Sequence, residues 1–319
     1  MKRKTGKPGK RRAGKGKGAP LFTPAAAVLI VVAFVLGAVI AALIGGYIDT
    51  GSVPPEETGV AAVPVVPPPP PPRPMPPTPP APTKASVRVA FVIDDMGGGM
   101  KRLRELAEVS APVTVAVLPH LRYSKEVARE AHAKGMEVLL HLPMEPRDAV
   151  THDPGEGALL TAMTEDEVRL RTRVAIDAIP YITGVNNHMG SRFTEDERLM
   201  RAALDVVGER DFLFLDSRTS NRSVGGRVGR ELGVRTVERN VFLDNTRDEE
   251  YIRGQVEELV AIARKRGGAI GIGHPYPETI AVLLEMIPAL IEDGVEVVRL
   301  SDLVAEAGGG AKAPGGPGK

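Results

Sequence analysis

Residues 88–98, with the sequence RVAFVIDDMGG, decide how the rest of the chain is interpreted. The apolar and β-branched run up to Ile93 indicates a buried strand. It is followed by two adjacent carboxylates, Asp94 and Asp95, and then by the glycines 97–99, which indicate a turn. In parallel sheets and barrels the carboxyl ends of the strands form the ligand-binding face, so paired acids there suit a metal ion and a general base. Taken alone, the same residues are equally typical of a capped turn.

Residues 86–306 alternate between short apolar runs and amphipathic stretches. This alternation predicts one α/β domain with a parallel sheet or barrel. Helix starts are indicated by the Ser/Thr-x-x-Glu spacing at Thr164, Thr194 and Thr246, and helix ends by Gly135 and Gly267. The runs predicted as strands are 87–93, 113–118, 136–140, 182–186, 212–215, 241–243, 269–273 and 295–300.

Polar residues follow most of these runs, and four of the six histidines are among them. Because the ends of parallel strands meet at one rim, we expect these side chains to converge. The other two histidines, His132 and His152, are interpreted as surface or packing residues. The residues predicted at or near the rim are Asp94, Asp95, His120, His141, Glu145, Asn187, His188, Ser191, Asp216, Asp244 and His274.

Two histidines and one carboxylate with an open fourth position are typical of a catalytic zinc site. Asp95, His141 and His188 can supply such a set from three strand ends. Asp94 is then placed to act as general base, and His274 to donate a proton to the leaving group, with Asp216 or Asp244 available to orient a partner. These residues indicate metal-assisted hydrolysis of an amide or ester.

The first 48 residues predict a membrane anchor. Residues 1–24 form a basic tail, with nine Lys or Arg and no acid in residues 1–17, and residues 25–48 are uncharged and mostly apolar. A helix of 24 residues is roughly 36 Å long, enough to cross a hydrocarbon core of about 30 Å. The excess of Lys and Arg before the span predicts a cytoplasmic N-terminus and a periplasmic domain, held by one helix in the inner membrane.

The segments on either side of the domain are low in complexity. Residues 49–85 form a predicted linker, because 15 of the 29 prolines lie between 54 and 82 and favour an extended, semi-rigid arm. Residues 307–319 are rich in Gly, Ala and Pro and are predicted to be disordered. The whole chain has a formal charge of +1 and its basic tail +9, so the remainder carries −8, and no nucleic-acid partner is expected.

The domain resembles the divergent polysaccharide deacetylase family, distant relatives of the NodB-type carbohydrate esterases. The resemblance covers essentially the whole predicted domain and follows the family's order of motifs. The matching segments are FVIDDMG (91–97), PVTVAVLP (112–119), EVLLHLPMEP (137–146), NNHMGSRFT (186–194), FLDSRT (214–219) and IGHP (272–275).

The resemblance implies an irregular (β/α) barrel, with Asp94 as catalytic base, Asp95 as metal ligand and His274 as catalytic acid. Deacetylases of the ordinary kind take two histidine ligands from one His-x-x-x-His motif, whereas here Glu145 stands four residues after His141. Either Glu145 is a ligand or His188 replaces the missing histidine, and we favour His188. Residues expected to contact the substrate or support the ligands are Glu145, Asn187, Ser191 and Asp216.

The sequence thus predicts a membrane-anchored, periplasmic deacetylase that depends on a divalent metal, zinc by the ligand types. The expected substrate is an envelope polysaccharide, with peptidoglycan as one candidate. The alternative is a non-catalytic module that binds or regulates envelope glycans and retains the deacetylase fold.

Overall fold

The computed structural model describes residues 87–308, and within them nine parallel strands form a single curled sheet. The strand order is β6-β5-β4-β3-β2-β1-β8-β7, with β9 paired to β1. Most strands are rich in Val, Ile and Leu, as expected for a parallel sheet covered on its outer face. The strands are β1 (Val87–Met96), β2 (Thr114–Val117), β3 (Glu137–Met144), β4 (Ile182–Met189), β5 (Leu213–Asp216), β6 (Thr236–Glu238), β7 (Val241–Phe242), β8 (Gly268–Gly273) and β9 (Val295–Val297).

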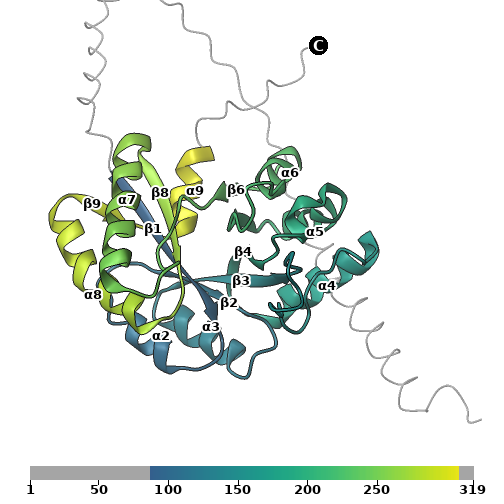
Figure 1. Cartoon of the computed structure of the whole chain (residues 1–319), viewed down its shortest axis with the longest axis horizontal. Helices are drawn as coiled ribbons and strands as arrows, with labels where there is room; N and C mark the ends of the chain where they lie inside the picture. The colour runs from purple at the N-terminus through teal and green to yellow at the C-terminus, as the bar shows by residue number, and fades with distance from the viewer. Residues whose placement is uncertain (1–86, 309–319) are drawn as a thin grey trace, which may run out of the picture. The chain divides into compact units, whose positions relative to one another are not determined.

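Helices surround the sheet on its convex side (Figure 1). This curled parallel sheet with an outer layer of helices agrees with the predicted (β/α) barrel. The helices are α2 (Lys101–Leu106), α3 (Ser124–Ala133), α4 (Glu165–Ala178), α5 (Glu197–Glu209), α6 (Gly225–Glu231), α7 (Glu249–Arg266), α8 (Pro277–Glu292) and α9 (Leu300–Gly308), with a 3₁₀ turn η1 (Phe193–Glu195).

Only one of the three predicted capping boxes is formed. Thr164 accepts a hydrogen bond from the backbone N–H of Glu167, whose side chain accepts from Thr164 in return. The helices α5 and α7 are instead capped by Asp196 and Asp248. In both cases an aspartate two residues after the predicted cap accepts from the N–H of the third helical residue, Leu199 or Tyr251. A carboxylate there also interacts favourably with the helix dipole.

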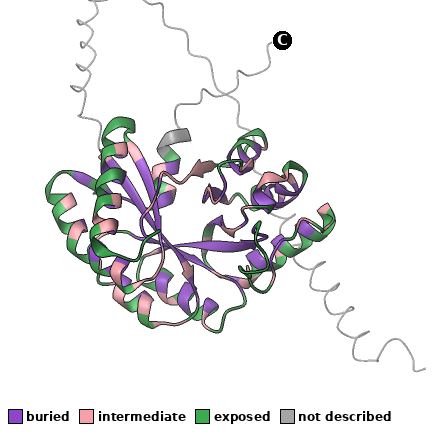
Figure 2. Ribbon diagram, in the orientation of Figure 1, coloured by how far each residue is buried: buried purple, intermediate pink, exposed green. Residues whose placement is uncertain are grey.

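The domain has two apolar layers because side chains alternate across each strand. In β1, Val89, Phe91 and Ile93 pack against the outer helices, whereas Ala90 and Val92 face the interior of the curl. The strands are accordingly the most deeply buried part of the structure (Figure 2). Among the described residues, the fully buried aromatic side chains are Phe91, Phe193 and Phe214, so aliphatic packing dominates the core.

The sheet does not close by pairing of its edges, β6 and β7. Instead, the chain crosses from the β6 edge to the β7 edge at two consecutive residues, Arg239 and Asn240. The N–H of Arg239 donates to the Asp216 carbonyl at 3.0 Å, and the N–H of Asn240 donates to the Ile270 carbonyl at 2.9 Å. The barrel is therefore open along this line. One edge of the open sheet is β6, a strand that the sequence analysis did not predict.

The interior is closed at the amino ends of the strands by α9. Leu300 and Val304 belong to the interior apolar cluster. The buried carboxylate of Glu137 accepts hydrogen bonds from Thr114 Oγ1 at 2.9 Å and Thr183 Oγ1 at 2.8 Å, and from the Ser301 N–H at 3.2 Å. Glu137 thus joins the starts of β2, β3 and β4 to the first turn of α9. This leaves the opposite end of the barrel for the polar residues.

The predicted basic tail (1–24), membrane anchor (25–48) and linker (49–85) lie outside the described residues. So does the predicted C-terminal tail, except that residues 307 and 308 complete α9. Between residues 87 and 308, no helix combines the length and apolar character needed to cross a membrane.

Replacing Glu137 by Ala should lower the free energy of unfolding by about 3 kcal/mol, because buried donors then lose their acceptor. Urea denaturation of the full chain at neutral pH measures this. As a control, Glu209→Ala removes a half-exposed partner of Arg173 and should cost about 0.5 kcal/mol. Equal losses in the two variants would contradict the role given to Glu137.

Candidate active site

The two acids that follow Ile93 lie within β1, not after it as predicted, and both reach the same cleft. Neighbouring residues of a regular strand point to opposite faces. Here the pairing of β1 with β2 shifts register between Ile93 and Met96, and Asp95 has a positive φ of 56°. Aspartate tolerates this conformation better than most residues. The irregularity allows Asp94 and Asp95 to face the cleft together.

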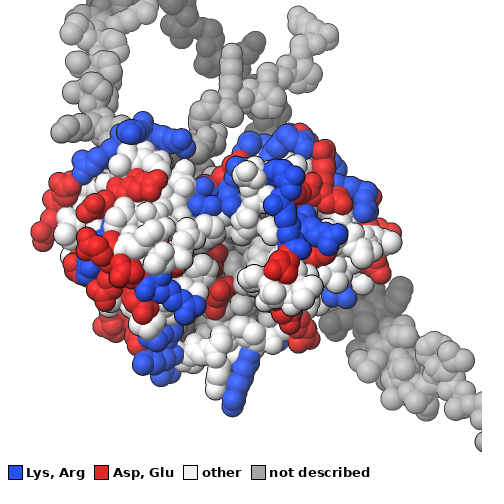
Figure 3. Space-filling view, viewed as in Figure 1, with Lys and Arg blue, Asp and Glu red and all other residues white. Residues whose placement is uncertain are grey.

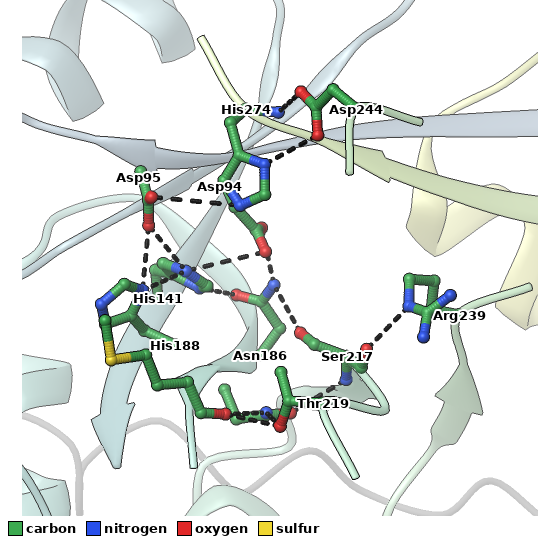
Figure 4. A network of polar contacts seen from close by, with 12 residues as sticks. Asp94, Asp95, His141, Asn186, His188, Ser217, Thr219, Arg239, Asp244 and His274 are labelled. Carbon is green, nitrogen blue, oxygen red and sulfur yellow. Dashed lines mark hydrogen bonds and ion pairs between the residues drawn. The ribbon is translucent and has the colours of Figure 1, made fainter. Parts of the chain in front are cut away.

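The histidines also lie within longer strands than predicted. His141 is in β3 and His188 in β4, and these strands pair in register, His141 with Asn186 and Pro143 with His188. His141, Asn186 and His188 all face the interior of the barrel (Figure 4). Of the three histidines that line the cleft, only His274 follows its strand, β8, as predicted. His120 also follows its strand, β2, as predicted.

Asp95, His141 and His188 present three potential ligand atoms to one another. Asp95 Oδ1 lies 3.2 Å from His141 Nε2 and 2.9 Å from His188 Nδ1. The two ring nitrogens are 3.1 Å apart. The three atoms therefore form a nearly equilateral triangle.

This triangle fits a metal ion. Ligands about 2.0–2.1 Å from a tetrahedral zinc are about 3.3–3.4 Å from one another. Asp95 Oδ1 is buried and accepts no hydrogen bond, although it lies 3.2 Å and 2.9 Å from the two imidazole nitrogens. A buried oxygen without a hydrogen bond is costly, and a cation between the three atoms would satisfy it. Two imidazoles and one carboxylate are ligand types that suit zinc.

Asn186 connects the triangle to Asp94. Its Oδ1 lies 2.8 Å from His141 Nδ1 and its Nδ2 donates to Asp94 Oδ1 at 2.8 Å. Since an amide oxygen only accepts, His141 carries its proton on Nδ1 and leaves Nε2 free to bind a metal. The sequence analysis missed Asn186 and named its neighbour Asn187. Alternation along a strand reaching His188 would have indicated Asn186.

His274 is oriented by Asp244. Its Nδ1 lies 2.8 Å from Asp244 Oδ1, and its backbone N–H donates to the other carboxylate oxygen at 2.6 Å. Thr279 Oγ1 donates to that oxygen at 2.7 Å. Nε2 is thereby turned toward Asp95, 4.0 Å from its Oδ2. Burial alone would lower the pKa of His274, but the hydrogen bond and charge of Asp244, with the nearby Asp95 and Asp94, raise it to about 9.

The two carboxyls of β1 have opposite pKa shifts without a metal. Burial raises the pKa of Asp94, which is only 2 % exposed, against the opposing effect of His141 and His274. Burial would also raise the pKa of Asp95, but the imidazoles of His141 and His188 hold it far below its usual range. Asp95 is thus a carboxylate at neutral pH, as a metal ligand must be.

These groups surround a cleft of about 190 Å³. Ser217, Thr219, Met189 and Phe242 also line it and were not singled out from the sequence. Ser217 directly follows β5 and Thr219 comes two residues later, so their position after a strand was the available signal. The full lining is Asp94, Asp95, His141, Asn187, His188, Met189, Ser217, Thr219, Phe242 and His274.

The other predicted residues differ in their distance from the cleft. Asn187 lines it and accepts a hydrogen bond from the Ser217 N–H at 2.9 Å. Glu145, the alternative metal ligand, lies beyond the end of β3, and its carboxylate accepts from Thr161 and Arg192 instead.

The remaining three lie outside the cleft lining. Ser191 accepts from the Arg147 N–H. Asp216 faces the helix side and accepts from Ser223 and Gly226 at the start of α6. His120 is exposed, with its ring beside Gly157.

Comparisons with known proteins agree with this fold. The family model of the divergent polysaccharide deacetylases matches residues 91–304. An uncharacterized protein of Haemophilus influenzae is 36% identical over 219 residues, which is 69% of this chain and 77% of that protein. The uncharacterized protein YibQ of Escherichia coli is 36% identical over 220 residues, 69% of this chain and 68% of that one.

Among solved structures, an uncharacterized protein of Agrobacterium tumefaciens is 27% identical, with a TM-score of 0.66, and the match covers 68% of this chain and 89% of that chain. The family model spans all nine strands apart from the first residues of β1, and with them every residue of the cleft. The chain belongs to the divergent polysaccharide deacetylase family.

Proposed function

We propose that this protein is a metal-dependent deacetylase that hydrolyses the acetamido groups of a polysaccharide. The observation that supports this most is the convergence of Asp95, His141 and His188 with a buried acid, Asp94, and an oriented imidazole, His274, on one cleft. Membership of the family supports the fold and the class of substrate. A non-catalytic glycan-binding module would need none of these five groups in this arrangement.

Asp95, His141 and His188 would hold the metal, which supplies a Lewis acid for hydrolysis when it is bound. Zinc suits their two nitrogens and one oxygen. Asp94 acts as general base from beside the ligands, since its Oδ2 lies 3.6 Å from His141 Nε2. Asn186 fixes both groups by donating to Asp94 and accepting from His141.

His274 acts as general acid on the opposite side of the cleft. Asp244 keeps the proton on Nδ1 and favours the doubly protonated ring, so Nε2 can deliver a proton to the departing amine. A carboxylate that orients an imidazole in this way also stabilises its charged form. Hydrolysis of the acetamide would release acetate and leave a free amine on the sugar.

We further propose that the protein acts on an envelope polysaccharide such as peptidoglycan, from the periplasmic side of the inner membrane. The apolar segment 25–48, the basic tail before it and the proline-rich linker 49–85 support this location. The linker would hold the domain away from the bilayer, where a cell-wall polymer can reach the cleft.

The metal site is tested by elemental analysis of the purified full chain after equilibration with zinc. We expect about one zinc per chain. His188→Ala and His141→Ala should lower zinc affinity at least about tenfold, because each removes a ligand. The matched control is Glu145→Gln, which should retain zinc. Loss of zinc in Glu145→Gln with retention in His188→Ala would show that the ligand set is wrong.

Catalysis is tested by acetate release from oligomers of N-acetylglucosamine. Asp94→Asn and His274→Ala should each lower kcat about 10²- to 10⁴-fold, because each removes a proton-transfer group. Zinc content should be unchanged in both variants.

His152→Ala serves as the control for the loss of an exposed imidazole and should retain full activity. Unchanged acetate release in Asp94→Asn and His274→Ala would disprove the assigned roles. Glycan binding by the wild-type protein without acetate release, insensitive to chelators, would favour the non-catalytic module.

The location is tested with alkaline phosphatase, a reporter that is active only outside the cytoplasm. Fused after Lys319 in a Gram-negative host, it should be active, because the Lys and Arg residues before the span retain the N-terminus inside. A fusion after Lys17 should be inactive. The reverse pattern, or equal activity of the two fusions, would exclude the proposed orientation.

A further inference from the structure

A second cavity adjoins the cleft on the side of the β1–α2 loop. Its volume is about 200 Å³, and it is lined by residues 95–99, Lys101, Arg102 and Pro275. Asp95 also borders the cleft, and Pro275 directly follows the proposed acid His274. The two cavities are therefore neighbours that share one wall. None of the roles proposed above uses the second cavity.

The glycines keep this second cavity open. A Cβ added to Gly98 or Gly99 would meet no atom within 4 Å, so both residues border free space. Gly97 has a φ of 122° and packs against the first residue of α3, where a Cβ would lie 3.0 Å from Ser124 Oγ. The loop is thus held by Gly97 and leaves room beside Gly98 and Gly99 for a ligand group.

The cationic groups that line the second cavity are Lys101 and Arg102. Lys101 and Arg102 both pair with one carboxylate, Glu105, at 3.7 Å and 2.5 Å, so one positive charge remains uncompensated by these contacts. The Lys101 side chain is 80 % exposed, and its ion pair with Glu105 is long, so a ligand can compete for it. The Asp95 carboxylate points toward the imidazoles of the cleft (Figure 4). In the space-filling view, both cationic and acidic surface border the central hollow, which itself contains acidic atoms (Figure 3).

We propose that the second cavity binds the carboxylate of the sugar next to the one that is deacetylated, and hence that the substrate is an acidic N-acetylated glycan. One uncompensated positive charge matches a single carboxylate better than a doubly charged phosphate. Because the second cavity adjoins the metal ligands, a sugar bonded to the reacting one can reach it. The proposal rests on the deacetylase function but concerns which glycan the cleft selects.

The test compares two probes that differ only in charge. The first is a tetrasaccharide of hyaluronan, in which N-acetylglucosamine alternates with glucuronate, and the second is the same tetrasaccharide with its carboxylates reduced to alcohols. Isothermal titration of the zinc-loaded full chain should give a Kd about tenfold lower for the acidic probe. Raising the salt concentration should reduce this ratio.

The double variant Lys101→Gln, Arg102→Gln should bring the ratio of the two Kd values close to one. Arg266→Gln, which removes a cation at the far end of α7, should retain the wild-type ratio. Equal affinity of the wild type for both probes, absence of binding to either, or a ratio retained in the double variant would each overturn the proposal.

Acetate measured in the same samples separates this proposal from the proposed function. Acetate released equally well from both probes would leave the deacetylase function intact and disprove the acidic subsite. A preference for the acidic probe that is lost in the double variant, without acetate release, would support the subsite and count against catalysis.

Discussion

The site depends on one departure from regular strand geometry, the irregularity at Asp94 and Asp95. In a regular strand one of these carboxylates would point into the outer helical layer, where it would be buried without partners at a large cost. The register shift and the positive φ of Asp95 place both acids at the cleft instead. A left-handed residue costs about 1–2 kcal/mol, and aspartate tolerates it more readily than bulkier residues do. Without this local strain, the proposed base and the proposed metal ligand could not act on the same molecule.

The remaining polar groups of the site are arranged around these two acids. His141 is buried between Asp94 and Asp95, and Asn186 ties it to Asp94. On the other side, Asp244 and Thr279 hold His274. Buried charges are stable only when they are paired and hydrogen-bonded, and here the acids and imidazoles compensate one another. The apolar interior below, closed by α9, keeps these groups at one end of the barrel.

Much of this organisation could be predicted from the sequence. Alternating apolar runs and helix signals indicated the α/β barrel, and the residues after each run indicated which end would carry the chemistry. Asp95, His141 and His188 were grouped correctly in space because the carboxyl ends of parallel strands converge. Their roles as ligands stay predictions until a metal is measured.

What could not be predicted depended on strand ends and side-chain direction. The predicted strands ended at residues 140 and 186, whereas β3 and β4 continue past His141 and His188. With the strand ends placed too early, the alternation that points Asn186 into the barrel could not be recognised. Asp216 follows the strand pattern but faces α6, where the helix start supplies its donors. Glu145 has the four-residue spacing from His141 of a family motif, yet β3 ends at Met144 and the chain then turns toward Leu159. Local sequence does not specify such a turn.

The position of β1 also affects how the domain can assemble during translation. It is the first strand of the domain, yet it pairs with β8 and β9, and α9 at the end of the domain fills the space between the sheet's inner faces. Because synthesis proceeds from the N-terminus, β1 and β2 are made before β8 and β9. Until those last strands are made, the edge of β1 that pairs with them has no partner. The contacts that α9 makes inside the barrel can form only after the end of the domain has been synthesised. Such long sequence separations slow folding, and the exposed edge of β1 is where a chaperone would be needed most.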